Sequence, residues 1–191
     1  LAAMYQLNEF SSIKASYGRT VQYAQLASNA SSGIPFDMWF PTSPNIKPQK
    51  CDQFSIGYFR NFLNNEIETS VEFFYKNIHN VIDFADNATL IGNLYIDGEV
   101  RAGKGYAYGA EFLLRKNFGD FSGWISYTYS KSMRKIPGIN YDREYVSPYD
   151  RPHNLSIVLN YAFNKRFDVS ASWVYNTGQP VTYPCGKYTV D

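Results

Sequence analysis

The sequence predicts an all-β fold made of the antiparallel strands of a transmembrane β-barrel. Apolar and polar residues alternate with a period of two, which is the period of a strand with two different faces. The alternating segments are about 10 residues long, as in tilted membrane-spanning strands, whereas globular strands average about 5 or 6 residues. Short and long connections also alternate along the chain, as they do in barrels that keep their tight turns at one rim.

The composition limits the possible classes of protein but does not choose between them. The 191 residues include 17 Tyr and 14 Phe, and the formal net charge is +1. This charge gives no reason to expect a nucleic-acid partner. The mean hydropathy is −0.36, and no run of about 18 apolar residues is present, which excludes a membrane-spanning helix. An aromatic-rich chain that is polar on average fits a spanning barrel or an extracellular β-sandwich, so the pattern must decide.

The strands are predicted one after another from their alternation. In residues 13–23, for example, Ile13 and Tyr17 share one face, while Lys14 and Ser16 share the other. The same pattern, with a short first segment, predicts eight strands, at residues 2–7, 13–23, 54–62, 67–76, 105–115, 125–130, 154–163 and 168–176.

The connections between these strands predict that the sheet spans a membrane. Tight connections are expected at residues 8–11, 63–65, 119–120 and 164–166, and long polar ones at 27–50, 85–104 and 135–152. A soluble sandwich has no reason to keep every short turn at one end. Aromatic residues near the strand ends suit interfacial girdles, with candidates Tyr5, Phe62, Trp124 and Trp173.

A spanning sheet must also close, because hydrocarbon leaves no partner for an unpaired strand edge. Eight strands are enough for a small barrel. However, the first strand is short, no signal peptide is recognisable, and the chain ends in loop-like sequence. We therefore expect an arc of a larger barrel.

Six segments also resemble a known family. They are residues 16–22 (SYGRTVQ), 45–49 (NIKPQ), 103–112 (GKGYAYGAEF), 123–130 (GWISYTYS), 147–156 (SPYDRPHNLS) and 176–182 (NTGQPVT). In this order they resemble TonB-dependent receptors of the bacterial outer membrane, particularly those of Bacteroidetes. The resemblance implies a 22-stranded barrel, occluded by a plug domain, that imports a scarce nutrient with TonB-derived energy. It makes residues 1–191 an internal stretch of the C-terminal half of the barrel, without the plug and the final strands.

Three hypotheses for function follow. The first is the nutrient receptor, whose solute could be an iron chelate, cobalamin, an oligosaccharide or a peptide, and whose partners would be outer-membrane lipid, the TonB complex and a surface lipoprotein. The alternative is a small eight-stranded barrel with a structural or adhesive role. The third is an outer-membrane hydrolase using His153, Asn154 and Ser156. No motif with a positioned nucleophile and base is visible, so we expect no enzyme, catalytic residue, cofactor or metal.

Two groups of residues are candidates for contact with a solute. Exposed aromatic rings and Arg on long loops suit ligand capture, although such rings can instead pin the loops together. The loop candidates are Trp39, Phe40, Tyr141, Arg143 and Tyr145. The candidates for lining the lumen are Glu68, Glu72, Lys76, Glu111 and Arg115, which would form either a charged conduit or a solvated wall with cross-strand ion pairs. Cys51 and Cys185 are expected in different loops, and their oxidation state stays open.

Overall fold

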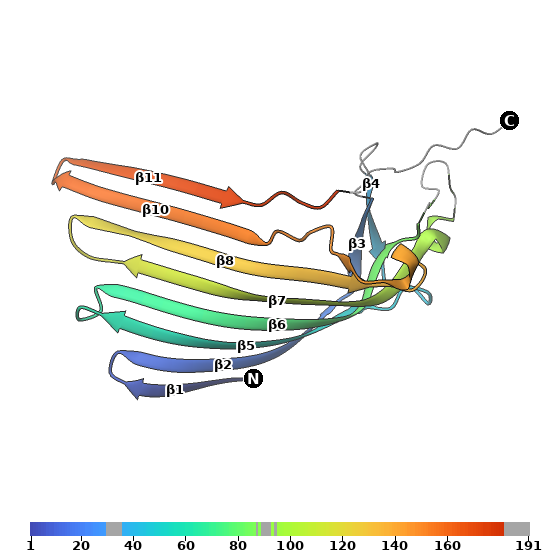
Figure 1. Ribbon diagram of the computed structural model, residues 1–191, viewed down its shortest axis with the longest axis horizontal. Coiled ribbons are helices and arrows are strands. Elements are labelled where there is room, and N and C mark those ends of the chain that lie inside the picture. The colour runs from blue at the N-terminus through green and yellow to red at the C-terminus, as the bar shows by residue number, and fades with distance from the viewer. Residues whose placement is uncertain (30–35, 87, 89–92, 94, 182–191) are drawn as a thin grey trace.

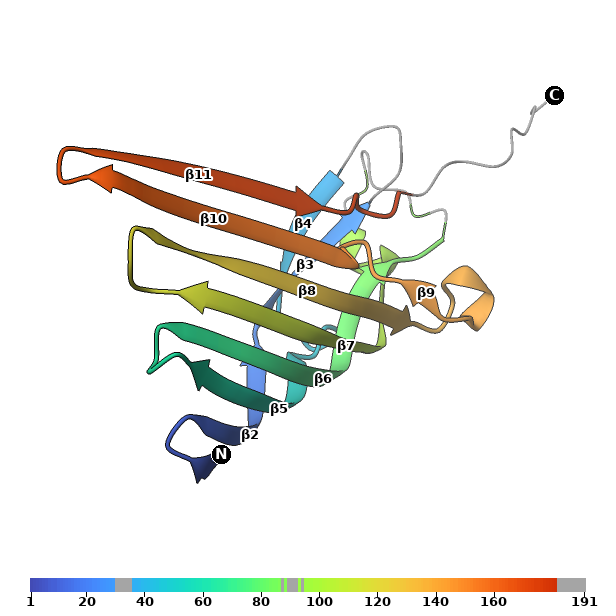
Figure 2. The same ribbon diagram turned by 60° about the vertical axis from the view of Figure 1, so that its left-hand side comes forward.

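The protein forms one long, curved antiparallel sheet with a smaller folded region at one end (Figures 1 and 2). The computed structural model describes residues 1–29, 36–86, 88, 93 and 95–181. Eight strands follow one another across the main sheet: β1 (Ala2–Asn8), β2 (Ser11–Gln22), β5 (Gln49–Phe62), β6 (Ile67–Phe84), β7 (Val100–Lys116), β8 (Phe121–Lys135), β10 (His153–Asn164) and β11 (Phe167–Asn176).

The remaining elements lie in the long connections. They are the hairpin β3 (Ala24–Asn29) and β4 (Phe36–Pro41), the short strand β9 (Tyr145–Val146), which pairs with β8, and the 3₁₀ helices η1 (Ile96–Glu99) and η2 (Asn140–Asp142). Within the described residues, no helix is long and apolar enough to cross a membrane.

The predicted all-β architecture is confirmed, including all eight main strands and the four tight connections between them. These connections gather at one end of the sheet, the turn end, and the long connections gather at the other, the loop end (Figure 1). The turn between β5 and β6 is sharp because Leu63, Asn64 and Asn65 all have positive φ, at 50°, 53° and 71°. Asn tolerates this left-handed conformation better than most residues.

The register separates two faces of the main sheet. Tyr17, Phe54, Tyr75 and Tyr108 stand opposite one another on successive strands and define the apolar face. Large apolar side chains of this face are open to the surroundings: Phe73, for example, is 55% exposed. A soluble monomer rarely exposes such a continuous apolar surface, whereas a membrane barrel turns it toward lipid.

One predicted girdle residue lies on the other side. Trp124 pairs in register with Arg115 and with Val158, and its neighbours along β8 are Gly123 and Ile125. Because side chains alternate along a strand, Trp124 lies on the polar face, opposite to Ile125. The prediction that Trp124 belongs to an interfacial girdle is therefore wrong.

The sheet does not close within the described residues. β1 and β11 are its two edges, and each pairs with one neighbour. A sheet that spans a membrane cannot leave such edges open, since lipid cannot pair their backbone groups. The eight strands are thus an arc of a larger barrel, and the eight-stranded closed barrel is not observed.

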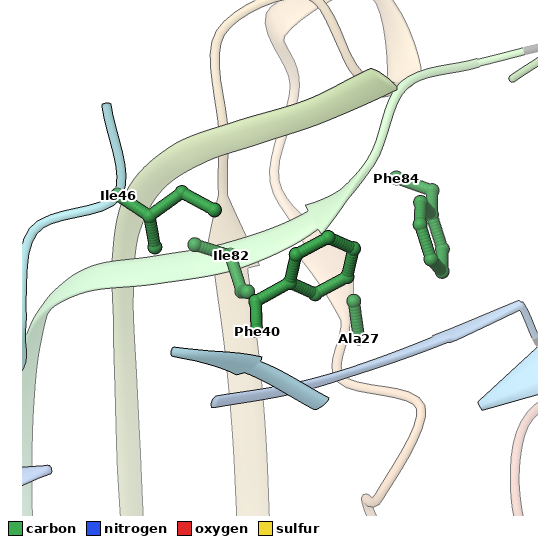
Figure 3. Close-up of a cluster of buried hydrophobic side chains, with 5 residues drawn as sticks. All are labelled: Ala27, Phe40, Ile46, Ile82 and Phe84. Carbon is green, nitrogen blue, oxygen red and sulfur yellow. The ribbon is translucent and has the colours of Figure 1, made fainter. Parts of the chain in front are cut away.

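The loop end contains structure that the sequence pattern did not predict. The hairpin β3–β4, at residues 24–29 and 36–41, begins just before the predicted loop 27–50 and lies mostly within it, and β6 and β7 run past their predicted ends to residues 84 and 100. The extended part of β6 contains a bulge at Asn80, which has φ 58°. The hairpin packs on the extended strands and buries the main hydrophobic cluster (Figure 3), made of Ala27, Phe40, Ile46, Ile82 and Phe84.

Candidate functional site

A buried polar network holds the loop end together. Arg134 on β8 forms an ion pair with Asp83 on β6, with 3.0 Å between Nη1 and Oδ2, and both side chains are about one-tenth exposed. Arg134 also donates to the carbonyl of Ile82 at 3.3 Å, and the backbone N–H of Phe84 donates to Asp83 Oδ1 at 3.0 Å. A buried ion pair is tolerated where further hydrogen bonds satisfy its atoms, as here.

The connection between β8 and β10 completes this network. The Tyr145 hydroxyl donates to Asp83 Oδ2 at 2.9 Å, and the Tyr149 ring lies 5.5 Å from the Arg134 guanidinium. Burial, reinforced by the negative charge of Asp83, raises the pKa of Tyr145 well above its usual value. Burial also raises the pKa of Tyr149. Both phenols therefore stay neutral, and Tyr145 remains a hydrogen-bond donor.

A cavity of about 290 Å³ lies beside the network, between the hairpin β3–β4 and the loop-end part of the wall. Its lining is mixed: amides and hydroxyls come from Gln22, Gln25, Gln49, Ser132, Ser147 and Tyr149, and apolar side chains from Leu26, Ile78, Val81, Ile82 and Met133. Gln25 is 3% exposed; its Nε2 donates to the carbonyl of Lys47 at 3.1 Å, while its Oε1 has no partner among the described residues. A buried unpaired acceptor is unfavourable, and Gln25 Oε1 is the unsatisfied side-chain atom among the described residues.

The loop candidates from the sequence divide into exposed and buried residues. Trp39 is 62% exposed and Tyr141 is 90% exposed, and Arg143 is also on the surface. Phe40, by contrast, is 3% exposed inside the hydrophobic cluster, and Tyr145 binds Asp83. The rings of Trp39 and Tyr141 and the guanidinium of Arg143 are therefore accessible to a solute. Phe40 and Tyr145 instead hold the loops in place.

The five charged residues predicted to line the lumen lie on one face of the neighbouring strands β6 and β7. Glu68 pairs in register with Arg115, at 4.0 Å between Oε2 and Nη1, and accepts a hydrogen bond from Asn117 at 2.8 Å. Glu72 and Glu111, however, stand opposite each other as like charges. Lys76 lies four residues beyond Glu72 on the same face of β6, with its Nζ 5.3 Å from the centre of the Phe74 ring. The set is a mixed, solvated surface and contains one ion pair.

Close approach explains two glycines in this region. A Cβ on Gly109 would lie 2.7 Å from the ring of Phe74, and one on Gly57 would lie 2.6 Å from Glu72. Glycine at these positions leaves room on the polar face for larger side chains of the neighbouring strand.

The residues proposed for a hydrolase are not assembled. His153 lies on the apolar face, where its Nδ1 is 2.8 Å from the hydroxyl of Tyr127, while Asn154 and Ser156 alternate to the polar face. The structure therefore gives His153 a hydrogen-bonding role in the wall. Among the described residues, no group of three or more His, Cys, Asp or Glu could hold a metal ion. Cys51 lies in strand β5, not in a loop, and has a free thiol, whereas Cys185 falls outside the described residues.

The sequence pattern missed the cavity because its lining comes from segments far apart in the chain. Gln22 ends β2, Gln49 begins β5, Ser132 is on β8 and Ser147 follows β9. No short motif joins them. The available signal was the alternation in residues 24–29, where Gln25 and Ala27 share the buried face of the hairpin.

Two solved structures have a similar fold. The FpvAI–pyocin S2 complex matches with a TM-score of 0.61 and 16% identity, over 90% of this chain and 22% of that chain. Pseudomonas aeruginosa FpvA bound to a heterologous iron–pyoverdine matches with a TM-score of 0.59 and 17% identity, over 92% of this chain and 24% of that chain. This chain thus spans about a quarter of the length of these relatives. No curated protein sequence matches it.

The family model described as TonB dependent receptor-like, beta-barrel, matches residues 1–190. This match covers nearly the whole chain and agrees with the open antiparallel arc, the alternating turns and the apolar face. The family is one of outer-membrane proteins. The chain therefore belongs to the TonB-dependent receptor family, as part of its β-barrel.

Proposed function

We propose that this chain forms part of the wall and external mouth of an active transporter, which captures a scarce solute and imports it with TonB-derived energy. The cavity at the loop end, with its mixed polar and apolar lining, carries this proposal. It is built by long connections over one side of the wall, which is where a receptor would meet its solute. The plug and the segment that contacts the TonB complex belong to parts of the protein outside residues 1–191.

The orientation follows from barrel architecture. Long loops of outer-membrane barrels face the outside and short turns face the periplasm. The loop end is then external, the apolar face meets outer-membrane lipid, and the polar face lines the lumen. Glu68, Glu72, Lys76, Glu111 and Arg115 would line that lumen below the cavity.

The chemistry of the cavity favours a neutral polar solute or a polar part of a larger one. Its one charged lining residue, Arg134, is already paired with Asp83, and its other polar groups are neutral amides and hydroxyls. Hydroxyl or amide groups would pair with such a lining. The exposed rings of Trp39 and Tyr141, with Arg143, would make the first contacts outside the cavity. A surface lipoprotein partner would act at the same external side.

Uptake by living cells tests the transport proposal. The full-length protein is expressed in an outer membrane that cannot otherwise take up the test solutes, and accumulation of a labelled iron chelate, cobalamin, oligosaccharide and peptide is measured. We expect accumulation of one class, and its loss when TonB is deleted. Accumulation of every class that is unaffected by loss of TonB would instead indicate a passive pore.

A pair of variants tests the site. Gln25→Leu removes an amide from the cavity lining, with its bond to Lys47, at nearly constant volume and is expected to weaken solute binding by about tenfold, since a lost hydrogen bond in a buried site costs about 1–3 kcal/mol. Tyr5→Leu, on the apolar face of β1, is the matched control and should bind normally. Equal binding by both variants would remove Gln25 from the site.

A further inference from the structure

The apolar face ends in basic residues toward the loop end. Six residues there carry a permanent or titratable positive charge and share the face of the aromatic row, because they occupy the same alternate positions on their strands. This basic band consists of Arg19, Lys50, His79, Lys104, Lys131 and Lys135.

The register aligns four members of the basic band. Lys50 pairs with His79, His79 with Lys104, and Lys104 with Lys135, across the consecutive strands β5 to β8. Like charges directly opposite on neighbouring strands destabilise a sheet. Lys104 and Lys135 are such a pair of permanent charges, so an anion that lies against them would stabilise this part of the sheet.

The described residues provide an anion for Arg19, which pairs with Asp52, but not for the lysines. Lys50, Lys104 and Lys135 are exposed, and neither they nor Lys131 forms an ion pair with a described residue. Asp52 neutralises Arg19 of the band itself, and Glu144 is bound to a tyrosine hydroxyl, so neither acid pairs with a lysine of the band. Asp52 accepts from Arg19 at 2.6 Å and from the Tyr17 hydroxyl at 2.7 Å, and Glu144 accepts from the Tyr106 hydroxyl at 3.0 Å.

The height of the band points to the membrane surface. His79 lies about twelve residues along β6 from Ile67, which starts the strand at the turn end. At about 3.3 Å per residue and a tilt of about 40°, it stands roughly 30 Å above that end. The apolar band of an outer-membrane barrel is about 25 Å tall, so the basic row lies just beyond the hydrocarbon, at the level of the lipid headgroups.

We propose that the basic band binds the phosphate groups of an anionic lipid in the external leaflet. The four lysines of the band face lipid, lie at or near headgroup height and form no ion pair with a described residue, and phosphate supplies the complementary charge. Long Lys side chains reach the headgroups while their methylene stems cover the hydrocarbon boundary. The inference rests on the orientation proposed above, and it is independent of the solute that is transported.

Binding of lipid A, a glycolipid with two phosphates, tests the proposal. The full-length protein in detergent is titrated with lipid A and with its dephosphorylated form, and binding is followed by native mass spectrometry. We expect wild type to prefer the phosphorylated form, and the triple variant Lys50→Gln/Lys104→Gln/Lys135→Gln to bind it about tenfold more weakly or worse. Inorganic phosphate alone should compete poorly, since the site extends over several strands.

The matched control is Lys14→Gln/Lys116→Gln/Lys165→Gln, which removes three charges outside the band. Heat-dependent mobility on a denaturing gel checks that each barrel is assembled, and TonB-dependent uptake separates this proposal from the transport proposal. Equal binding of both lipids by wild type would overturn the inference without using any variant. So would a triple variant that keeps lipid A but loses a co-purifying acidic protein.

Discussion

Phe73 in the middle of the wall and Phe40 in the loop-end hairpin illustrate two ways of placing an aromatic ring. The side chain of Phe73 is 55% exposed on the apolar face, whereas Phe40 is 3% exposed among Ala27, Ile46 and Ile82. The wall relies on lipid to cover its apolar surface, so its own strands need little core. The loop end projects beyond lipid and must bury its apolar groups within the protein, as a soluble domain does.

The contrast extends to polar groups. On the wall, charged residues stay on the polar face or at the level of the headgroups. At the loop end, Arg134 and Asp83 are buried, with their atoms satisfied by Tyr145 and backbone groups. A substitution that hardly matters in one region should therefore matter greatly in the other, and the following changes measure that difference.

The largest effect is expected at the buried ion pair. Arg134→Ala leaves Asp83 buried without its counter-charge and should destabilise the loop end by about 3–5 kcal/mol. Hydrogen exchange of the amides in β6, β8 and β9 measures the local opening. Replacing both partners, in Arg134→Met/Asp83→Leu, should cost less than the single change. If the single change left exchange as slow as in wild type, the pair would not stabilise this region.

A comparably large effect is expected at the hairpin. Phe40→Ala removes a buried ring from the hydrophobic cluster and should cost about 3–5 kcal/mol in local stability. Trp39→Ala, one residue away and 62% exposed, should change stability by less than about 0.5 kcal/mol. Limited proteolysis between β2 and β5 compares them. Similar cleavage rates in the two variants would contradict the assignment of faces in the hairpin.

The wall should respond next. Ile157→Lys places a charge toward lipid and should oppose assembly by about 2–4 kcal/mol. Tyr108→Lys should cost less, because Tyr108 pairs in register with Lys131 and therefore lies nearer the lipid headgroups. Glu72→Lys, on the polar face opposite Glu111, should assemble normally because it relieves a like-charge pair. The fraction of barrel that resists unfolding on an unboiled gel measures assembly. Equal assembly of all three would contradict the assignment of the two faces.

The smallest effect concerns a single hydrogen bond and its dependence on pH. Tyr145→Phe removes the bond to Asp83 and should lower local stability by about 1.5–3 kcal/mol at neutral pH. Because the folded protein raises the pKa of Tyr145, the unfolded chain loses this proton first, near pH 10. The contribution is therefore complete below about pH 10 and declines as pH rises further. Protease sensitivity of the loop end from pH 8 to 11 should rise more steeply in wild type than in Tyr145→Phe.

The sequence by itself determined the class of fold, the eight main strands, the sides of the sheet and the membership of Glu68, Glu72, Lys76, Glu111 and Arg115 in one polar face. These features follow from local rules, because alternation sets the face of each residue and loop length sets which ends of the strands share a rim.

Only the tertiary structure decided how the loop end is built. The hairpin β3–β4 lacks long alternation, and whether Phe40 or Trp39 is buried depends on contact with Ile82, more than forty residues away. The cavity around Gln25 and the pairing of Arg134 with Asp83 also join segments distant in the sequence. Such contacts depend on where the strands bring their ends together, which the pattern of any single segment does not contain.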